Sequence, residues 1–314
     1  MRLCRLLVPG WRGPVAWTGI AVCTTVTALV TAELLGSFGL YRGWVFLALA
    51  VIAALALWRW LPESGEEGGV ELVHMPASAW MTWIGLGVAA VAIAVFAVGV
   101  RVKLGTGMTG FDSTWYHGPF AAGFADSGHT FQLHQLAPQF LTWFYPQNSE
   151  LIHSMGMLAF GNDLLSPLIN LGWMVACLLA AWCIGRPYGG APISLAGVAI
   201  VLASTAMADQ SGEARNDIVG TFFILAALAV MINAAAGGRR LPTGPLVLTM
   251  LAAGLAAGTK VNFIPAALAI AAGAIVLSPK ASRLKSSVIA AGALILGGGY
   301  WYLRNLTHSG NPLP

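Results

Sequence analysis

The sequence predicts an all-α, polytopic membrane protein, and three observations lead to that prediction. Of its 314 residues, 57% are hydrophobic and only 9% are charged, with a mean hydropathy of +0.76. A soluble domain carries about 25% charged residues, so a chain of this composition needs lipid as part of its solvent. Apolar runs of nearly membrane-spanning length recur along the chain, and basic residues flank them unevenly. We therefore expect one membrane domain over residues 1–314.

Each apolar run is expected to form one helix across the bilayer, because about 20 residues are needed to cross the hydrocarbon core. The first run, Val15 to Leu35, is longer than the hydrophobic region of a signal peptide, so we interpret it as a span. About nine transmembrane helices follow from this interpretation. Their expected ranges are 15–35, 43–60, 79–100, 164–185, 191–208, 218–236, 244–258, 261–278 and 286–303.

The basic residues predict the orientation. If the N-terminus is cytoplasmic, ten of the 16 lie on the inner side: Arg2, Arg5, Arg12, Arg59, Arg186, Arg239, Arg240, Lys280, Arg283 and Lys285. The other six lie outside: Arg42, Arg101, Lys103, Arg215, Lys260 and Arg304. Inner loops of membrane proteins are enriched in Lys and Arg, which favours this orientation. The net charge of +4 then reflects topology rather than nucleic-acid binding. The inner loop 62–76 also holds four glutamates, which count little in that rule.

The orientation places a long segment, residues 101–163, outside the membrane. Two parts of it are predicted to be helical: Ser113–Asp126, interrupted at Gly118-Pro119, and Ser149–Phe160. The second is too short to span, so we expect interfacial helices here. Long loops of this kind are usually functional. The sequence therefore predicts that the chemistry of the protein is on the extracytoplasmic side.

Charged residues collect beside the outer ends of the predicted spans, where a charge is costly unless it is paired or used. They are Asp112, Glu150, Asp163, Arg215, Asp217, Lys260 and Arg304.

Structural roles for these residues stay open. Asp112 precedes a predicted helix and either caps it or acts as a base, and capping is the favoured role for Asp217. Arg215 and Asp217 could form a simple surface pair. Glu150 suits the first turn of a helix, where an acid favours the helix dipole.

The histidines and cysteines give no clear metal site. Four histidines share the external segment, His117, His129, His134 and His153, but no pair has a recognised ligand spacing. The four cysteines suggest small apolar packing residues rather than disulfides or ligands. We expect neither a metal nor another cofactor.

Five patches in order resemble the GT-C superfamily, the integral membrane glycosyltransferases that use polyprenyl-phosphate sugars. The patches are FDSTWYH, FYPQNSELIH, EARNDIVGTFFILAAL, AAGLAAGTK and YLRNLTHSGNPLP. The nearest likeness is to bacterial relatives of protein O-mannosyltransferases and aminoarabinose transferases. It covers about Trp80 to Pro314, whereas the first two spans depart from the pattern. The chain is short for this superfamily and ends directly after a predicted span, so we expect it to be a truncated or minimal version of its family.

The resemblance implies a mechanism. Asp112 would act as general base toward an acceptor hydroxyl, whose oxygen attacks the anomeric carbon while the lipid phosphate leaves. Positioned cations would stabilise that phosphate. The expected substrate-binding residues are Glu150, Arg215, Asp217, Lys260, Arg304, His117 and Tyr116.

The implied partners are a polyprenyl-phosphate sugar donor, an acceptor that is a glycan, lipid or protein, and the lipid bilayer. No nucleic acid is expected. The alternative is a secondary transporter or lipid carrier, which would place charges near the bilayer midplane and show broken helices in matching halves. A non-catalytic scaffold is a third possibility.

Overall fold

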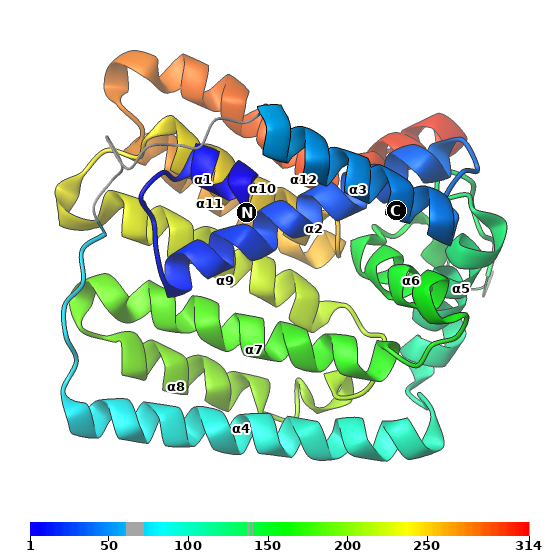
Figure 1. Cartoon of the computed structure of the whole chain (residues 1–314), viewed down its shortest axis with the longest axis horizontal. Helices are drawn as coiled ribbons and strands as arrows, with labels where there is room; N and C mark the ends of the chain where they lie inside the picture. The colour runs from blue at the N-terminus through cyan, green and yellow to red at the C-terminus, as the bar shows by residue number, and fades with distance from the viewer. Residues whose placement is uncertain (61–71, 137–138, 140, 314) are drawn as a thin grey trace.

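The computed structural model describes residues 1–60, 72–136, 139 and 141–313, and within these ranges it is helical without strands (Figure 1). The four glutamates of the predicted inner loop lie outside the described residues. The α-helices are α1 (Arg2–Leu7), α2 (Pro14–Ser37), α3 (Gly43–Trp60), α4 (Ala79–Thr106), α5 (Gly118–Ser127), α6 (Asn148–Phe160), α7 (Ser166–Gly185), α8 (Ala191–Leu202), α9 (Asp217–Ala235), α10 (Thr243–Ala257), α11 (Ile264–Leu277) and α12 (Arg283–Ser309).

All nine predicted spans contain a helix, but the range 191–208 was predicted too long, because α8 ends at Leu202. Among the described residues, six helices are long and apolar enough to cross a membrane: α2, α3, α4, α7, α9 and α12. The other three, α8, α10 and α11, are apolar but shorter. A multi-pass membrane protein follows from the six, while the count of nine stays a prediction.

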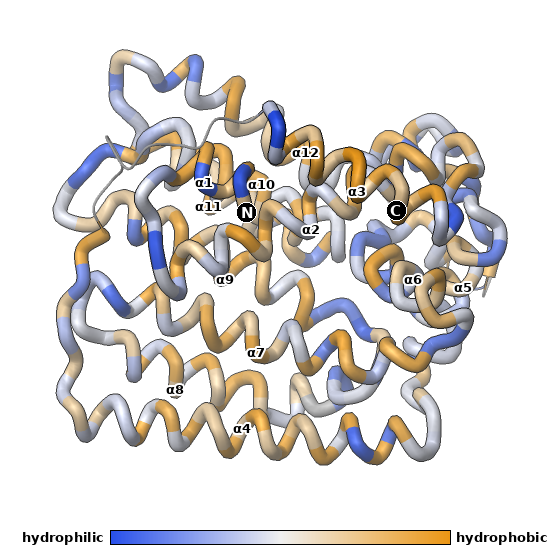
Figure 2. Tube along the Cα trace, viewed as in Figure 1, coloured by the Kyte–Doolittle hydropathy of each residue, from blue (hydrophilic) through white to orange (hydrophobic). Residues whose placement is uncertain are grey.

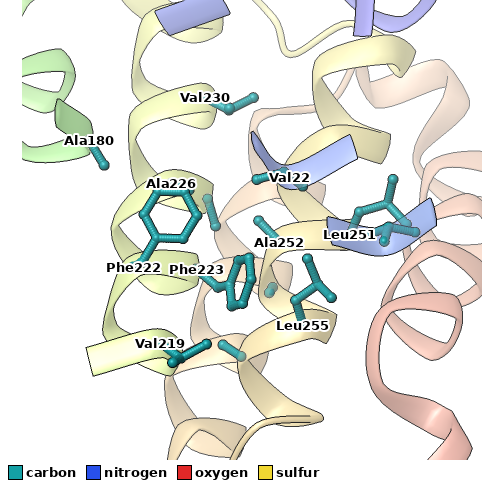
Figure 3. Packing of buried hydrophobic residues seen from close by; sticks show 14 of the residues in the cluster. Val22, Ala180, Val219, Phe222, Phe223, Ala226, Val230, Leu251, Ala252 and Leu255 are labelled. Carbon is teal, nitrogen blue, oxygen red and sulfur yellow. The ribbon is translucent and has the colours of Figure 1, made fainter. Parts of the chain in front are cut away.

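The centre of the bundle is packed from small and aromatic side chains of α2, α9 and α10 (Figure 3). Phe222 and Phe223 of α9 are fully buried and lie near Leu255 of α10. Glycines let α10 and α12 approach closely, because a side chain on Gly254 or Gly298 would collide with the backbone of the other helix. Lipid is as apolar as these residues, so close packing rather than the hydrophobic effect holds such helices together.

The helices run between two ends of the bundle. α5 and α6 lie at one end, on the right of Figure 1, with the ends of α4 and α12; we call this the α5–α6 end. The α7–α8, α9–α10 and α11–α12 turns lie at the opposite end. Figure 2 shows hydrophobic residues along the helices and most hydrophilic stretches at the two ends. This arrangement is the one that a bilayer crossing the bundle between its ends requires.

Both helices predicted within residues 101–163 are present, while their position at the membrane interface stays a prediction. Ser113–Asp126 corresponds to a five-residue π-helical turn, η1 (Ser113–His117), followed at once by α5, and Ser149–Phe160 corresponds to α6. The expected interruption at Gly118-Pro119 is a change of helix type rather than a break.

Candidate active site

Asp112 stands at the entrance of the π-helical turn. Its backbone is already helical, with φ −63° and ψ −36°, and its side chain makes no capping hydrogen bond. The capping role is therefore wrong. The turn closes through the bond from Gly118 N to Ser113 O, and a Cβ on Gly118 would lie 2.7 Å from that same oxygen. Glycine is needed here, and π-helical turns are frequent at functional sites.

The Asp112 carboxylate pairs with Arg215. Asp112 Oδ2 lies 3.2 Å from Arg215 Nη2, and the other terminal nitrogen, Nη1, lies 3.1 Å from Asp209 Oδ2. The side chains of Asp112 and Arg215 are 32% and 20% exposed, so both are accessible from outside. One guanidinium thus serves two carboxylates, and the expected pairing of Arg215 with Asp217 is wrong.

Asp217 begins α9, as predicted, but does not cap it. Its Oδ1 lies 2.5 Å from Lys260 Nζ, and its Oδ2 accepts a hydrogen bond of 3.0 Å from Gln210. Lys260 is 31% exposed. Only Asn216 separates Arg215 from Asp217, and it donates to the backbone oxygen of Thr259 at 3.2 Å. The two ion pairs are therefore neighbours at the start of α9.

A buried carboxylate, Glu213, holds this loop against α4. Glu213 Oε1 lies 2.6 Å from Lys103 Nζ and accepts backbone hydrogen bonds from Thr109 and Gly110 at 3.1 and 2.9 Å. Burial alone would raise the pKa of Glu213, but the hydrogen bonds from Lys103, Ser113 and the two amides outweigh it, so the pKa is lowered. The residue is ionised at neutral pH, and it ties the loop to the segment that precedes Asp112.

Asn170 of α7 holds the same loop from the other side. Its side-chain amide is fully buried and donates to three backbone oxygens, those of Gln210, Glu213 and Arg215, at 3.2, 2.8 and 2.8 Å. Two scaffold helices, α4 and α7, therefore fix the position of Arg215.

A buried acid–imidazole pair lies behind the exposed one. His117, the last residue of η1, hydrogen-bonds to Glu150 in the first turn of α6, and both are almost fully buried. His153, one turn further along α6, is completely buried. Burial, and then the charge of His117, lower the pKa of His153 to about 3, so its ring is neutral. The buried pair joins the π-helical turn to α6.

Tyr116 connects the two groups. Burial raises its pKa, and the nearby carboxylates of Asp112 and Glu150 raise it further, so the phenol stays protonated. Its ring meets that of Tyr145 edge-on, with 6.4 Å between the centroids. The protonated phenol donates a hydrogen bond to the Asp112 carboxylate, which also raises its pKa.

Arg304 is present at this end of the molecule but is covered. It is 1% exposed, donates to Gln147 Oε1 at 2.8 Å and to the backbone oxygens of Trp143 and Tyr145, and lies over the ring of Trp301. Its donors thus organise residues 143–147, the segment that leads into α6. Of the three outer cations expected to meet phosphate, only Arg215 and Lys260 are partly exposed.

The largest cavity at this end, about 710 Å³, does not include Asp112. It lies between α5 and the end of α6, with Ser113 and Thr114 at one end and Asp126 and Asp163 among its lining. We place the reactive site at the ion pairs, since it is their groups that can accept a proton and hold an anion.

Metal-ligand groups are not assembled here: the described residues contain no cluster of three or more His, Cys, Asp or Glu arranged to hold a metal ion. His129 and His134 lie apart from the His117–Glu150 pair, with His134 hydrogen-bonded to the backbone oxygen of His129. The four cysteines are buried and free, as packing residues should be.

Sequence reasoning missed four residues of this site, which are Asp209, Glu213, Asn170 and Gln210. Glu213 stands inside the quoted patch EARNDIVG and could have been noticed there. Asn170 and Gln210 carry no pattern of their own, although an amide inside an apolar run is a general signal of a required hydrogen bond.

Comparison with known families supports the class of membrane glycosyltransferases of the GT-C type, to which part of the chain is similar. Residues 151–297 match the family model described as dolichyl-phosphate-mannose-protein mannosyltransferase, a family of the GT-C superfamily. The resemblance seen in the sequence is thereby confirmed. No curated protein and no solved structure matches the chain.

The matched range covers slightly less than half of the chain. It begins inside α6 and ends inside α12, so it includes Arg215, Asp217 and Lys260. Asp112 and Arg304 lie outside it, and their assignment depends on the geometry alone.

Proposed function

We propose that this protein transfers a sugar from a polyprenyl-phosphate donor to an acceptor on the extracytoplasmic side of the membrane, with Asp112 as general base. The observation that carries the proposal is the Asp112–Arg215 pair. It joins a carboxylate that can take a proton to a cation that can hold a phosphate, and both are accessible at one end of a membrane bundle.

The reaction is a displacement at the anomeric carbon. The acceptor oxygen forms a bond to that carbon, the bond from carbon to the phosphate oxygen breaks, and the acceptor proton passes to Asp112. A carboxylate is a weak base toward an alcohol, so proton removal accompanies attack rather than preceding it. The leaving group is a lipid phosphate, which needs cations but no added proton at neutral pH.

Arg215 couples donor binding to the base. In the resting site its guanidinium neutralises Asp112 and Asp209. A phosphate with two or three oxygens is a better bidentate partner for arginine than two separate, partly exposed carboxylates. When the donor phosphate takes over this guanidinium, the Asp112 carboxylate is released from its ion pair and is free to accept the hydrogen bond of the acceptor hydroxyl. Exposed pairs of this kind are worth under about 1 kcal/mol, so the exchange costs little.

The other residues have supporting roles in this proposal. Lys260, released from Asp217, is the second cation for the phosphate, and the Tyr116 phenol donates to a sugar or phosphate oxygen. Glu150 and His117 hold the π-helical turn in place from beneath. Arg304 acts through residues 143–147 rather than by meeting the donor directly.

The rival transporter reading would need charges along a path through the bundle. The ion pairs instead gather at the α5–α6 end. A site at the membrane boundary suits a lipid-linked donor, whose tail can stay in the bilayer while its phosphate meets the cations.

The test is donor consumption by purified protein supplied with labelled polyprenyl-phosphate sugars and a crude acceptor extract. Asp112→Asn keeps the size of the side chain but removes the basic oxygen, and we expect turnover to fall by about 10²–10⁴-fold. Asp209→Asn is the matched control, because Asp209 binds the same guanidinium and is 70% exposed. It should retain most activity. Lys260→Gln should raise KM for the donor as well as lower turnover.

Two results would count against the proposal. If Asp112→Asn turns over nearly normally, this residue is not the base. If Asp209→Asn loses as much activity as Asp112→Asn, the effect comes from the charge around Arg215, and the mechanism must be redrawn.

A further inference from the structure

An apolar groove follows the bundle between α4 and α8. Two adjoining cavities form it, of about 600 and 420 Å³, and they share Ile84 and Ile200 as lining residues. α4 and α8 run side by side along the lower edge of Figure 1. Along α4 the lining extends from Trp80 to Ala92, which at about 1.5 Å per residue is a groove about 18 Å long.

Small residues create the groove. The helices approach closely at Gly85, where a Cβ would lie 2.8 Å from the backbone oxygen of Pro192. Beyond it, Gly87 of α4 and Gly197 of α8 line the groove, and a Cβ on either would meet no atom within 4 Å. The two glycines therefore leave a channel that the protein itself does not fill.

The groove leads toward the ion pairs. Its last α8 residue is Ala203, where the loop that carries Asp209 and Arg215 begins. The next turns of α4 are covered by that same loop, through the bond from Ser211 to the backbone oxygen of Phe96 and the pair between Glu213 and Lys103. A chain lying in the groove would therefore end against the loop that carries Arg215.

We infer that this groove holds the isoprenoid tail of the lipid-phosphate donor and directs its phosphate to Arg215. The inference rests on the proposed function and adds the place where the lipid is recognised. Two other cavities fit this ligand less well. The α5–α6 cavity is lined by Asp126 and Asp163, which repel a phosphate. The cavity between α2 and α3 is smaller, about 300 Å³, and is lined by three threonines of α2.

The contribution of the groove is orientation rather than strong binding. A tail gains little by moving from lipid into an equally apolar groove, so only packing and alignment remain. The groove would fix where the phosphate sits, and such positioning enters turnover as well as affinity.

The first experiment measures tail occupancy without transfer. The purified protein in lipid nanodiscs is irradiated with polyprenyl phosphate that carries a diazirine midway along its tail and no sugar, and the labelled peptides are mapped. We expect label in α4 and α8, removed by excess unlabelled polyprenyl phosphate but not by phosphatidylglycerol. Label on other helices, or equal displacement by phosphatidylglycerol, would overturn the inference. An absence of label in α4 and α8 would also overturn the inference, because it is the result expected if another helix fills the groove.

The second experiment fills the groove. Gly87→Phe and Gly197→Phe place rings in open space, so the fold is retained, and Gly172→Phe is the control, since Gly172 of α7 also has no neighbour within 4 Å but does not line the groove. The two groove variants should lose the label and lower kcat/KM for a long-chain donor by about threefold to tenfold. Turnover of a short-chain donor should be unchanged. Unaltered labelling in both groove variants would refute the site.

The two proposals fail separately. If the groove is labelled but no donor is consumed, the transferase proposal is contradicted and the lipid-binding site in the groove is retained. Transfer that depends on Asp112 but labels other helices would leave the transferase and remove the groove.

Discussion

Replacing Asn170 by leucine is expected to loosen the loop that carries Arg215 without altering any group proposed to meet substrate. The side chain is fully buried in α7 and donates to the backbone oxygens of Gln210, Glu213 and Arg215. Leucine has a similar size but no donor. The variant therefore removes the hydrogen bonds while leaving little empty space.

The magnitude follows from the bonds that are lost. A buried hydrogen bond contributes about 0.5–1.5 kcal/mol net, and a buried oxygen left without a donor costs about 1–3 kcal/mol. The amide has two N–H groups for three oxygens, so one hydrogen bond is shared, and we expect a loss of about 2–4 kcal/mol in stability. In turnover, an Arg215 that moves by about 1 Å could cost about 100-fold.

Asn233 provides the matched control. It is also a fully buried asparagine, in α9, and its amide donates to the backbone oxygens of Cys183 and Ala229 at 2.8 Å each. It lies near the C-terminal ends of α7 and α9, opposite the α5–α6 end. Asn233→Leu should lower stability by about 1–3 kcal/mol and leave turnover near normal.

The assay compares thermal inactivation with initial rates at a temperature where both variants are folded. Asn170→Leu should be slow even when fully folded, and its KM for the donor should rise, because the phosphate partner is displaced. If the two leucine variants lose the same stability and keep the same turnover, the loop is not positioned through Asn170, and our account of how Arg215 is held is incorrect.

Two further predictions concern orientation and acid stability. In a cysteine-free background, cysteines at positions 215 and 260 should react with an impermeant reagent in intact cells, whereas one at 239 should be protected; the reverse pattern would invert the topology. The lowered pKa of Glu213 gives a stabilising contribution that is complete above its unfolded pKa and is lost as the pH falls below about 4.3. Inactivation rates measured from pH 7 down to pH 3.5 should therefore rise less steeply in Glu213→Gln than in the unaltered protein, and parallel curves would show that Glu213 does not carry this dependence.

The helices could be predicted from the sequence because the bilayer imposes their length and composition. Each predicted range, from 15–35 to 286–303, contains a helix, although α8 ends at Leu202, before the end of the predicted range 191–208. The helix α6 was also predicted. The helix boundaries and helix types that were not predicted are those that depend on contacts between individual residues. The turn at Ser113–His117 is π-helical because Gly118 allows a close approach to the Ser113 oxygen, and no hydrophobic period reports such a contact.

The charged residues were located correctly, at one end of the bundle, but their partners were not. The position of a charged residue at the end of a span indicates only that the charge must be paired or used, and it does not identify the partner. Local spacing suggested that Asp112 and Asp217 cap their helices and that Arg215 pairs with Asp217, two residues away. In the folded chain each of the two carboxylates meets a cation from another segment.

The partners of these charges were not predicted because they are set by the geometry of the folded chain. The same geometry depends on buried groups that no sequence pattern indicates. Arg215 and Asp217 flank Asn216 at the start of α9. Their side chains bind groups from different segments, Asp112 from the segment after α4 and Lys260 from the α10–α11 turn. These ion pairs form only when the loop that leads to Arg215 is held in place. Glu213 holds this loop against α4. That carboxylate holds the amides of residues 109 and 110 directly before Asp112, while the same loop extends to Arg215. The exposed pairs are individually weak, and the exchange with a donor phosphate that we propose can take place without moving the backbone, because the buried contacts already keep it in place.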